Sequence, residues 1–215
     1  MGTNVASGAS TDKSVESRRR IVDSARHEVE SKGILGLRVQ DVARNAGVSV
    51  PLIYKYFGDR DGLLAEVLSG MFVERSNRHL DAARQVIARH GEGTTVDDIV
   101  AAFVLPGTDD VKRDRALTLQ MLAAGAEIPS LAARLAETER EIHAQVVEFV
   151  TATFRTIGLG DAVPVAALAM LLQASSLGFV FNDLLGAAAV PDEEFTRLTR
   201  VLVESVVERH SALRS

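Results

Sequence analysis

The sequence contains no cysteine. That absence excludes a disulfide framework, a thiolate metal site and a cysteine nucleophile, and it is typical of proteins that stay in the cytosol. Aromatic residues are also scarce, at 5% of the chain, and tryptophan is absent. Hydrophobic residues nevertheless make up 47% of the 215 residues. A core would therefore be built mainly from leucine, valine, isoleucine and alanine.

Long apolar runs are lacking as well. The richest one, Val163–Leu172, is shorter than the roughly 20 residues that a membrane-spanning helix needs, and polar residues follow it. The N-terminal stretch MGTNVASGASTDKS holds no apolar segment of the kind that forms the core of a secretion signal. We therefore expect a cytoplasmic protein that does not contact a membrane.

Motifs that carry common catalytic chemistries are missing. No Gly-Lys pair occurs, which excludes a P-loop, and the motifs GxSxG, HExxH and GxGxxG are absent. None of the five histidines follows a glutamate by three residues, as a di-metal carboxylate bundle would require. Glu139 and His143 stand one helical turn apart and could share a metal ion, but a solvated pair is the simpler interpretation. We expect no enzyme, no catalytic residue, no metal site and no cofactor.

Charge is unevenly distributed along the chain. The net charge is −5, yet residues 13–60 contain ten basic and six acidic side chains and carry +4, which leaves −9 for the rest. A basic segment on an acidic body suits a protein that touches nucleic acid through one small module.

The stretch Val39–Phe57, VQDVARNAGVSVPLIYKYF, predicts two short helices joined by a tight turn. Apolar residues at helical spacing give each helix one inward face. Gly47 stands where the first helix must stop, because a residue without Cβ adopts the left-handed conformation of a C-cap at little steric cost. Ser49 is placed to cap the second helix with its hydroxyl. Such a helix-turn-helix can insert its second helix into the major groove of DNA.

The same region resembles the TetR family of transcriptional regulators. The resemblance lies in the AGVS turn and the YKYFGDRDGLL run that follows it, and it extends from about Ser17 to Leu64. It implies a DNA-binding head on a larger helical body that binds a small molecule and forms a homodimer.

The rest of the chain reads as helices separated by glycine and proline, with no alternating β pattern. We expect an all-α protein of about nine helices. Residues 1–14 are predicted to be a disordered tail, residues 15–60 a three-helix helix-turn-helix DNA-binding domain, and residues 61–215 a helical ligand-binding and dimerisation domain.

The expected reading helix, residues 50–56, opens with an apolar sequence. Val50, Pro51 and Leu52 offer no hydrogen bonds to base edges, so their direct readout is limited to contact with thymine methyl groups. Lys55 points outward on the predicted helix and is the best candidate for a polar base contact or a phosphate contact. More of the discrimination between DNA sequences would then depend on DNA shape.

The resemblance to the TetR family adds further contacts to this helix. It implies a phosphate hydrogen bond and packing from the aromatic positions Tyr54 and Tyr56, and a basic residue near phosphate at Arg60. Arg38 replaces the usual serine or threonine cap with a side chain able to reach a phosphate. The predicted DNA contacts are Arg38, Gln40, Ser49, Val50, Pro51, Leu52, Tyr54, Lys55, Tyr56 and Arg60.

The last two predicted helices carry apolar stripes that would need a covering partner. The alternative is that one stripe packs inward and leaves nothing for a partner. A twofold pair of heads would bind a near-palindromic operator with half-sites about 34–36 Å apart. The predicted dimer interface is Leu168, Leu171, Leu172, Ser175, Phe179, Leu198, Val201, Leu202 and Ser205.

An inducer pocket in the helical body is implied by the resemblance. Its candidate lining is Phe72, Phe103, Met121, Phe149 and Phe181, and each of these is also a candidate for ordinary core. A mostly aliphatic lining with few charges suits a small hydrophobic effector.

The sequence thus predicts a homodimeric, ligand-responsive regulator that binds double-stranded DNA, with repression as the expected outcome. The alternative is a small-molecule-binding helical bundle, or an enzyme, that keeps the head without using it. The apolar Val-Pro-Leu opening of the reading helix is the feature that favours this alternative.

Overall fold

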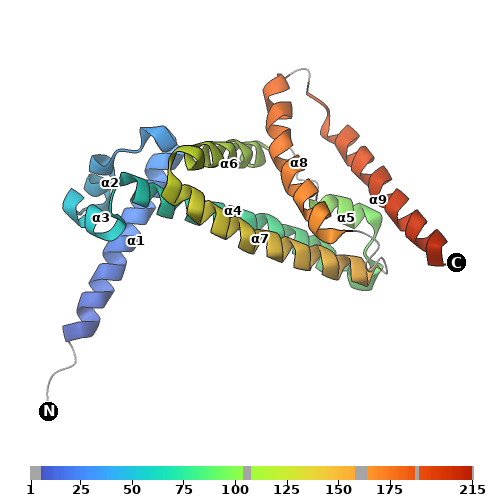
Figure 1. The fold of residues 1–215 in the computed structure, drawn as a ribbon, viewed down its shortest axis with the longest axis horizontal. Coiled ribbons are helices and arrows are strands. Elements are labelled where there is room, and N and C mark those ends of the chain that lie inside the picture. Colours follow the sequence, from blue (N-terminus) through green and yellow to red (C-terminus); the bar gives the residue numbers. More distant parts are fainter. Residues whose placement is uncertain (1–5, 104–107, 158–163, 187–188, 215) are drawn as a thin grey trace, which may run out of the picture. The chain divides into compact units, whose positions relative to one another are not determined.

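The computed structural model describes the backbone of residues 6–103, 108–157, 164–186 and 189–214. Within these ranges the chain forms helices and no β-strand, which confirms the predicted all-α class (Figure 1). The α-helices are α1 (Ala6–Lys32), α2 (Val39–Ala46), α3 (Val50–Phe57), α4 (Arg60–His90), α5 (Val96–Phe103), α6 (Asp109–Glu127), α7 (Pro129–Thr156), α8 (Val165–Leu185) and α9 (Asp192–Arg214), with short 3-10 turns at η1 (Ile34–Gly36) and η2 (Gly91–Gly93).

The largest difference from the expected helix boundaries is at the N-terminus. The sequence pattern predicts a first helix from about Val15, whereas α1 begins at Ala6. Residues 6–14, expected to belong to a disordered tail, therefore continue the helix. This segment contains no proline to stop the helix. Its last residue is tied to the head, because the Ser14 and Tyr56 hydroxyls lie 3.0 Å apart and share a hydrogen bond.

The turn between α2 and α3 forms at the predicted glycine. Gly47 adopts the left-handed conformation, with φ 66° and ψ 39°, and the amide of Val48 donates to the carbonyl of Ala43 at 3.0 Å. Ser49 is the N-cap of α3, but its hydroxyl makes no capping hydrogen bond, so the predicted cap was wrong. Pro51 occupies the first turn and has no amide to offer, while the Leu52 amide donates to the Ser49 carbonyl at 3.0 Å instead.

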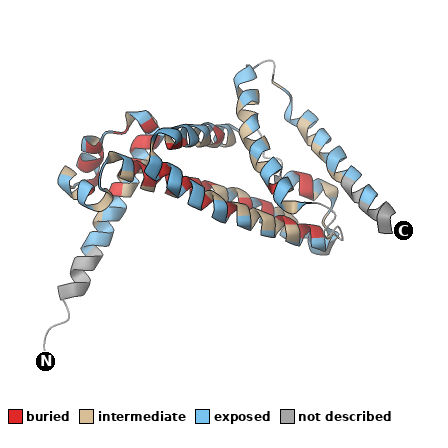
Figure 2. Cartoon of the chain, in the orientation of Figure 1, coloured by how far each residue is buried: buried red, intermediate tan, exposed pale blue. Residues whose placement is uncertain are grey.

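Aliphatic side chains from three helices form the core of the head. Ile21 and Ala25 of α1, Val42 of α2 and Ile53 of α3 are fully buried. Figure 2 shows this concentration of buried residues where α1, α2 and α3 meet. The position of α3 is therefore fixed from one side by Ile53, which leaves its other faces open to solvent.

The chain divides into two compact units. One contains residues 1–73 and 120–138, and the other contains residues 74–119 and 139–215. In the first unit the beginning of α4 buries Leu63, Leu64 and Leu68, and the corner between α6 and α7 buries Met121 and Leu131. This division differs from the boundary at residue 60 that the sequence suggested, and the predicted domain limits stay a prediction.

The second unit is held together by apolar clusters between consecutive helices. Val150 and Phe154 of α7 are buried against Val165 and Leu168 of α8. The Phe179 and Phe195 rings of α8 and α9 meet edge to face with centroids 4.6 Å apart. These contacts bury one side of α8, whereas much of its remaining surface is exposed or half-buried in Figure 2.

By length and composition alone, α8 could cross a membrane. Its mean hydropathy reaches 1.6, and only 6% of the apolar window is buried. The uninterrupted apolar run in this region is shorter than α8, because polar residues such as Gln173 and Asp183 follow it. The absence of a membrane contact stays a prediction. Two of those polar residues are engaged within the unit: Gln173 donates to Glu139 of α7 at 2.5 Å, and Asp183 accepts from Arg115 of α6 at 3.2 Å. Both contacts tie α8 to neighbouring helices.

A polar network joins α1 to α2 beside the head core. The Glu28 carboxylate is almost fully buried, and it accepts from Lys32 Nζ at 2.6 Å and from Asn45 Nδ2 at 3.1 Å. Lys32 also reaches Asp41 of α2 at 3.2 Å. The buried carboxylate of Glu28 thus has hydrogen-bond donors from both α1 and α2.

Replacing Lys32 with methionine is expected to lower the stability of the protein, because the buried carboxylate of Glu28 loses its cationic partner while keeping Asn45. Urea denaturation followed by circular dichroism would measure the loss. Lys112→Met is the matched control, since Lys112 is exposed on α6. Equal stability of the Lys32 and Lys112 variants would contradict this reading of the network.

Candidate nucleic-acid interface

Helix α3 presents most of its surface to solvent. Pro51, Tyr54 and Lys55 are exposed, and Val50 and Leu52 are half-buried, whereas Ile53 is fully buried. Tyr54 has 42% of its surface exposed. An exposed helix anchored by one core residue in this way has the form that enters a DNA groove.

Two cations beside α3 have no partner within the described part of the chain. Arg38 at the start of α2 and Lys55 on α3 are exposed and take part in no hydrogen bond or ion pair with any described residue. Gln40 and Ser49 are exposed as well. Unpaired cations on an exposed surface are available for phosphate oxygens, which dominate the affinity of proteins for DNA.

Other basic residues of the head are neutralised within it. Arg19 pairs with Glu16 at 2.8 Å and Asp23 at 3.4 Å. Arg44 pairs with Asp41. The positive charge that the sequence predicts for this region is therefore available only at certain positions, and Arg38 and Lys55 are two of them.

Arg60 and Tyr56 take up structural contacts in addition to their predicted DNA contacts. Arg60 donates through Nε to the Leu37 carbonyl and through Nη2 to the Ile34 carbonyl, both at 3.3 Å. These bonds fix the start of α4 to the segment before α2. The half-buried Tyr56 shares its hydroxyl hydrogen bond with Ser14 of α1. Both side chains stay predicted phosphate contacts.

An acidic residue of α4 joins two arginines from different helices. Glu66 accepts from Arg18 of α1 at 2.5 Å and from Arg134 of α7. Burial raises the pKa of Glu66, but the hydrogen bonds from the two arginines outweigh it and hold that pKa below its ordinary value. The Arg18 guanidinium also lies 5.3 Å from the centroid of the Phe57 ring at the end of α3. The bridge through Glu66 thus connects the end of the reading helix with α4 and α7.

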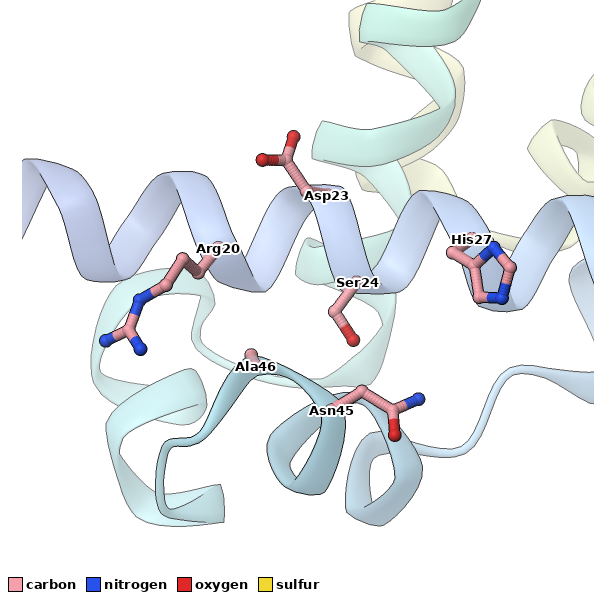
Figure 3. Close-up of a pocket in the computed structure, with 6 residues that line it drawn as sticks. All are labelled: Arg20, Asp23, Ser24, His27, Asn45 and Ala46. Carbon is pink, nitrogen blue, oxygen red and sulfur yellow. The ribbon is translucent and has the colours of Figure 1, made fainter.

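A pocket of about 410 Å³ lies on the head between α1 and the end of α2. In Figure 3, the Ser24 side chain projects from α1 toward α2, whereas Asp23 projects away. The Ser24 hydroxyl donates to the Val42 carbonyl at 3.1 Å, and Asn45 is held by Glu28. The polar lining of the pocket is thus partly committed to holding α1 against α2.

Residues 21–67, which contain α2, α3 and the start of α4, match the family model described as "Bacterial regulatory proteins, tetR family". These residues carry the DNA-binding region of the TetR family. The match covers the exposed α3 and the glycine turn before it, so this region is the helix-turn-helix of a DNA-binding transcriptional regulator.

Relatives of this chain are named as regulators. It is 23% identical to the HTH-type transcriptional regulator YdgC of Bacillus subtilis over 72% of this chain and 89% of YdgC. It is 34% identical to the HTH-type transcriptional regulator HbdR of Aromatoleum sp. over 41% of this chain and 39% of HbdR.

No described group of three or more histidine, aspartate or glutamate side chains is arranged to hold a metal ion.

Solved structures share the TetR fold along most of this chain. Salmonella enterica GusR superposes with a TM-score of 0.61 at 20% identity, over 89% of this chain and 95% of GusR. A transcriptional regulator from Saccharomonospora viridis in complex with choline superposes with a TM-score of 0.59 at 18% identity, over 88% of this chain and 96% of that protein. These similarities establish the fold.

The predicted ligand-binding residues of the TetR body occupy different surroundings. Phe72 and Met121, in the first unit, are buried. In the second unit Phe149 is half-buried, and Phe181 is 74% exposed. The side chain of Phe103 lies outside the described residues. Their role in binding a ligand stays a prediction.

The predicted dimer residues fall on two sides of the terminal helices. Leu171, Leu198, Val201 and Leu202 are each more than half exposed, and Ser205 is exposed. Leu168, Leu172, Ser175 and Phe179 are half-buried, and two of them pack inside the second unit as described above. Exposed apolar residues of α8 that the sequence analysis did not assign to the interface are Met170, Phe181, Leu184 and Leu185.

Several polar contacts of the body were not predicted because their partners are far apart in the sequence. Glu139 and His143, considered above as a metal pair, both bind the Gln173 amide of α8, with His143 Nδ1 2.9 Å from its oxygen. Burial raises the pKa of Glu139, against the effects of Gln173 and His143. Arg115 and Asp183 form an ion pair across α6 and α8. Hydrophobic periodicity carries no signal for such pairs.

Proposed function

We propose that this TetR-family protein is a homodimeric repressor that binds a near-palindromic DNA operator and is released by a small effector with an apolar body. It would act in the cytoplasm. The observation that carries the DNA-binding assignment is the exposed α3 flanked by the unpaired cations Arg38 and Lys55. Two heads on one dimer would address half-sites about 34–36 Å apart.

The geometry of α3 favours a particular division of labour on DNA. Arg38 and Lys55 supply phosphate contacts that set position, while Val50, Pro51 and Leu52 supply apolar contacts to thymine methyl groups. Because these apolar contacts discriminate weakly, a large share of the sequence preference would come from DNA shape. We therefore expect an operator rich in A·T pairs at the positions facing α3.

The effector would act by favouring one arrangement of the two heads. A ligand shifts such an equilibrium only through its different affinities for the two states. The Arg18–Glu66–Arg134 bridge offers one route, since it links the head to α4 and α7 within the first unit. A change in α4 or α7 that moves Glu66 would also move Arg18 of α1, which contacts Phe57 at the end of α3.

Lys55→Gln and Arg38→Gln are expected to weaken operator binding and to lower the salt dependence of the binding constant by about one unit of slope per removed phosphate contact. Fluorescence anisotropy with labelled fragments of the protein's own promoter region, at several salt concentrations, would measure both quantities. Lys112→Gln, in an exposed residue of α6, controls for charge alone. An unchanged slope in both head variants would remove Arg38 and Lys55 from the interface.

The same experiment separates the proposal from its alternative. The apolar opening of α3 also suits a small-molecule-binding bundle or an enzyme that keeps an unused head. If the wild-type protein binds no promoter fragment even at low salt, the alternative is favoured. If binding depends steeply on salt and is lost in the variants, the regulator is supported.

A further inference from the structure

Arg20 of α1 differs from the two arginines that precede it. Arg18 donates to the Glu66 carboxylate at 2.5 Å, and the hydrogen bond from Arg19 lowers the pKa of Glu16 most, with a smaller effect from the charge of Arg20. Arg20 itself is exposed and forms no hydrogen bond or ion pair with any described residue. Its guanidinium is therefore available to a ligand, whereas the charges of its two neighbours are neutralised within the head.

A cavity borders this guanidinium. Arg20 lines the pocket of about 410 Å³ between α1 and the end of α2. Asp23 belongs to the same lining, but its side chain projects away from α2 in Figure 3, and its carboxylate is paired with Arg19 at 3.4 Å. The space beside Arg20 can thus receive an anion, and the nearest acidic side chain of the lining along α1 is already engaged by another cation.

The position of Arg20 relates it to the turn of the helix-turn-helix. Its Nη1 lies 3.6 Å from the position that a Cβ on Gly47 would take, and Gly47 is the left-handed residue that ends α2. Ala46, the last residue of α2, also lines the pocket. Arg20 therefore stands beside the end of α2, whereas Arg38 immediately precedes its start.

These two unpaired cations lie at opposite ends of one short helix. With eight residues, α2 is about 12 Å long. When a helix-turn-helix binds DNA, its first helix crosses the sugar-phosphate backbone while the second lies in the major groove. Cations at the two ends of α2 would then face the backbone at separate points, and guanidinium groups bind phosphate oxygens through charge-assisted hydrogen bonds.

We propose that the pocket beside Arg20 is a further phosphate site of the DNA interface, in which Arg20 binds a backbone phosphate at the end of α2 while Arg38 binds another near its start. The assignment rests on the proposed function and deepens it, because it adds a residue of α1 to contacts that otherwise come from α2, α3 and the start of α4. Contacts at both ends of α2 hold the orientation of this helix on the backbone, and with it the register of α3 in the groove.

Arg20→Gln is expected to lower the salt slope of operator binding by about one unit and the affinity by about tenfold near 0.1 M salt. Fluorescence anisotropy of the full chain with labelled promoter fragments measures both quantities. Arg19→Gln is the matched control, because it removes the same charge one residue away from a side chain that Glu16 and Asp23 already engage. We expect this control to keep the wild-type slope. Equal losses in the two variants would show that only the net charge of α1 matters, and would overturn the site.

Two further variants separate a phosphate contact from a structural role. Arg20→Lys retains the charge and is expected to retain the slope, so a loss as large as that of Arg20→Gln would contradict an electrostatic contact. Arg20→Gln combined with Arg38→Gln is expected to lose about two units of slope, because two phosphates are contacted. A double variant with the same slope as Arg38→Gln alone would show that Arg20 adds no contact of its own.

The stability of Arg20→Gln and the DNA binding of the wild type complete the test. Because Arg20 bonds to no described residue, urea denaturation of Arg20→Gln is expected to match that of the wild type, and a clear loss of stability would assign it a structural role instead. Operator binding by Arg20→Gln with an unchanged slope overturns this site and leaves the regulator standing. Absence of DNA binding by the wild type, even at low salt, overturns both proposals.

Discussion

A double variant in which Leu171 and Phe181 are both replaced by glutamate is expected to convert the proposed dimer into monomers. Operator affinity is then expected to fall by about 10²–10⁴-fold, because each head would bind its half-site without the gain from a linked second head. Both side chains are exposed on α8, by 59% and 74% of their surface. Two like charges placed on each copy of a twofold apolar contact would face one another and lose their hydration.

The spacing of exposed residues on α8 supports a helix-to-helix contact. Leu171, Ala174, Gly178, Phe181 and Leu185 are exposed and follow one another at alternating steps of three and four residues, the spacing of a seam between packed helices. Outside its chain neighbours and the local backbone of α8, no described atom lies within 4 Å of the position that a Cβ on Gly178 would take. Large side chains thus flank a small-residue centre, where a second helix could approach closely.

The oligomeric state of the Leu171→Glu/Phe181→Glu variant is best measured by sedimentation velocity, with operator affinity measured on the same sample. Leu119→Glu is the matched control, since Leu119 is 49% exposed on α6, away from this seam in the sequence. A double variant that remains dimeric would show that α8 is not the contact. Phe181 would then be better explained by its other predicted role beside a ligand.

The local structure of the head could be predicted from the sequence because its signals are short-range. Gly47 has to accept a left-handed backbone, and it does so with φ 66°. Asp59 precedes α4 and caps it, since its carboxylate accepts from the Gly62 amide at 2.7 Å. Ile53 lies on the inward face of α3 and is fully buried. Each of these features depends on residues within one or two turns.

The orientation of α8 could not be predicted in the same way. Apolar residues surround this helix on all sides, so periodicity does not show which face packs inward. Phe179 is among the predicted dimer residues, yet its ring packs against Phe195 and Arg115 within the second unit. The decisive partners, Arg115 and Asp183, are 68 residues apart. Only the tertiary structure brings such a pair together.

Gly62→Ala is expected to destabilise the head by about 1–3 kcal/mol and to abolish operator binding, because the added methyl group has no room. A Cβ at this position would overlap the carbonyl oxygen of Phe57, the last residue of α3, and lie 3.2 Å from its carbonyl carbon. Both are backbone atoms and cannot rotate away. The end of the reading helix would therefore have to move relative to α4, which changes the presentation of Tyr54 and Lys55 to DNA.

Gly70→Ala, in the same helix, is expected to have the opposite effect. Apart from its chain neighbours and the backbone of its own helix turn, no described atom lies within 4 Å of the position of its Cβ. Alanine would therefore stabilise α4 by about 0.5–1 kcal/mol through the lower entropy of its unfolded state. Chemical denaturation of both variants, together with anisotropy titrations of operator DNA, would check the two signs. Because the same substitution is made twice in one helix, helix propensity alone predicts a gain at both positions. A stabilised Gly62→Ala variant that still binds DNA would show that the junction between α3 and α4 does not set the position of the reading helix.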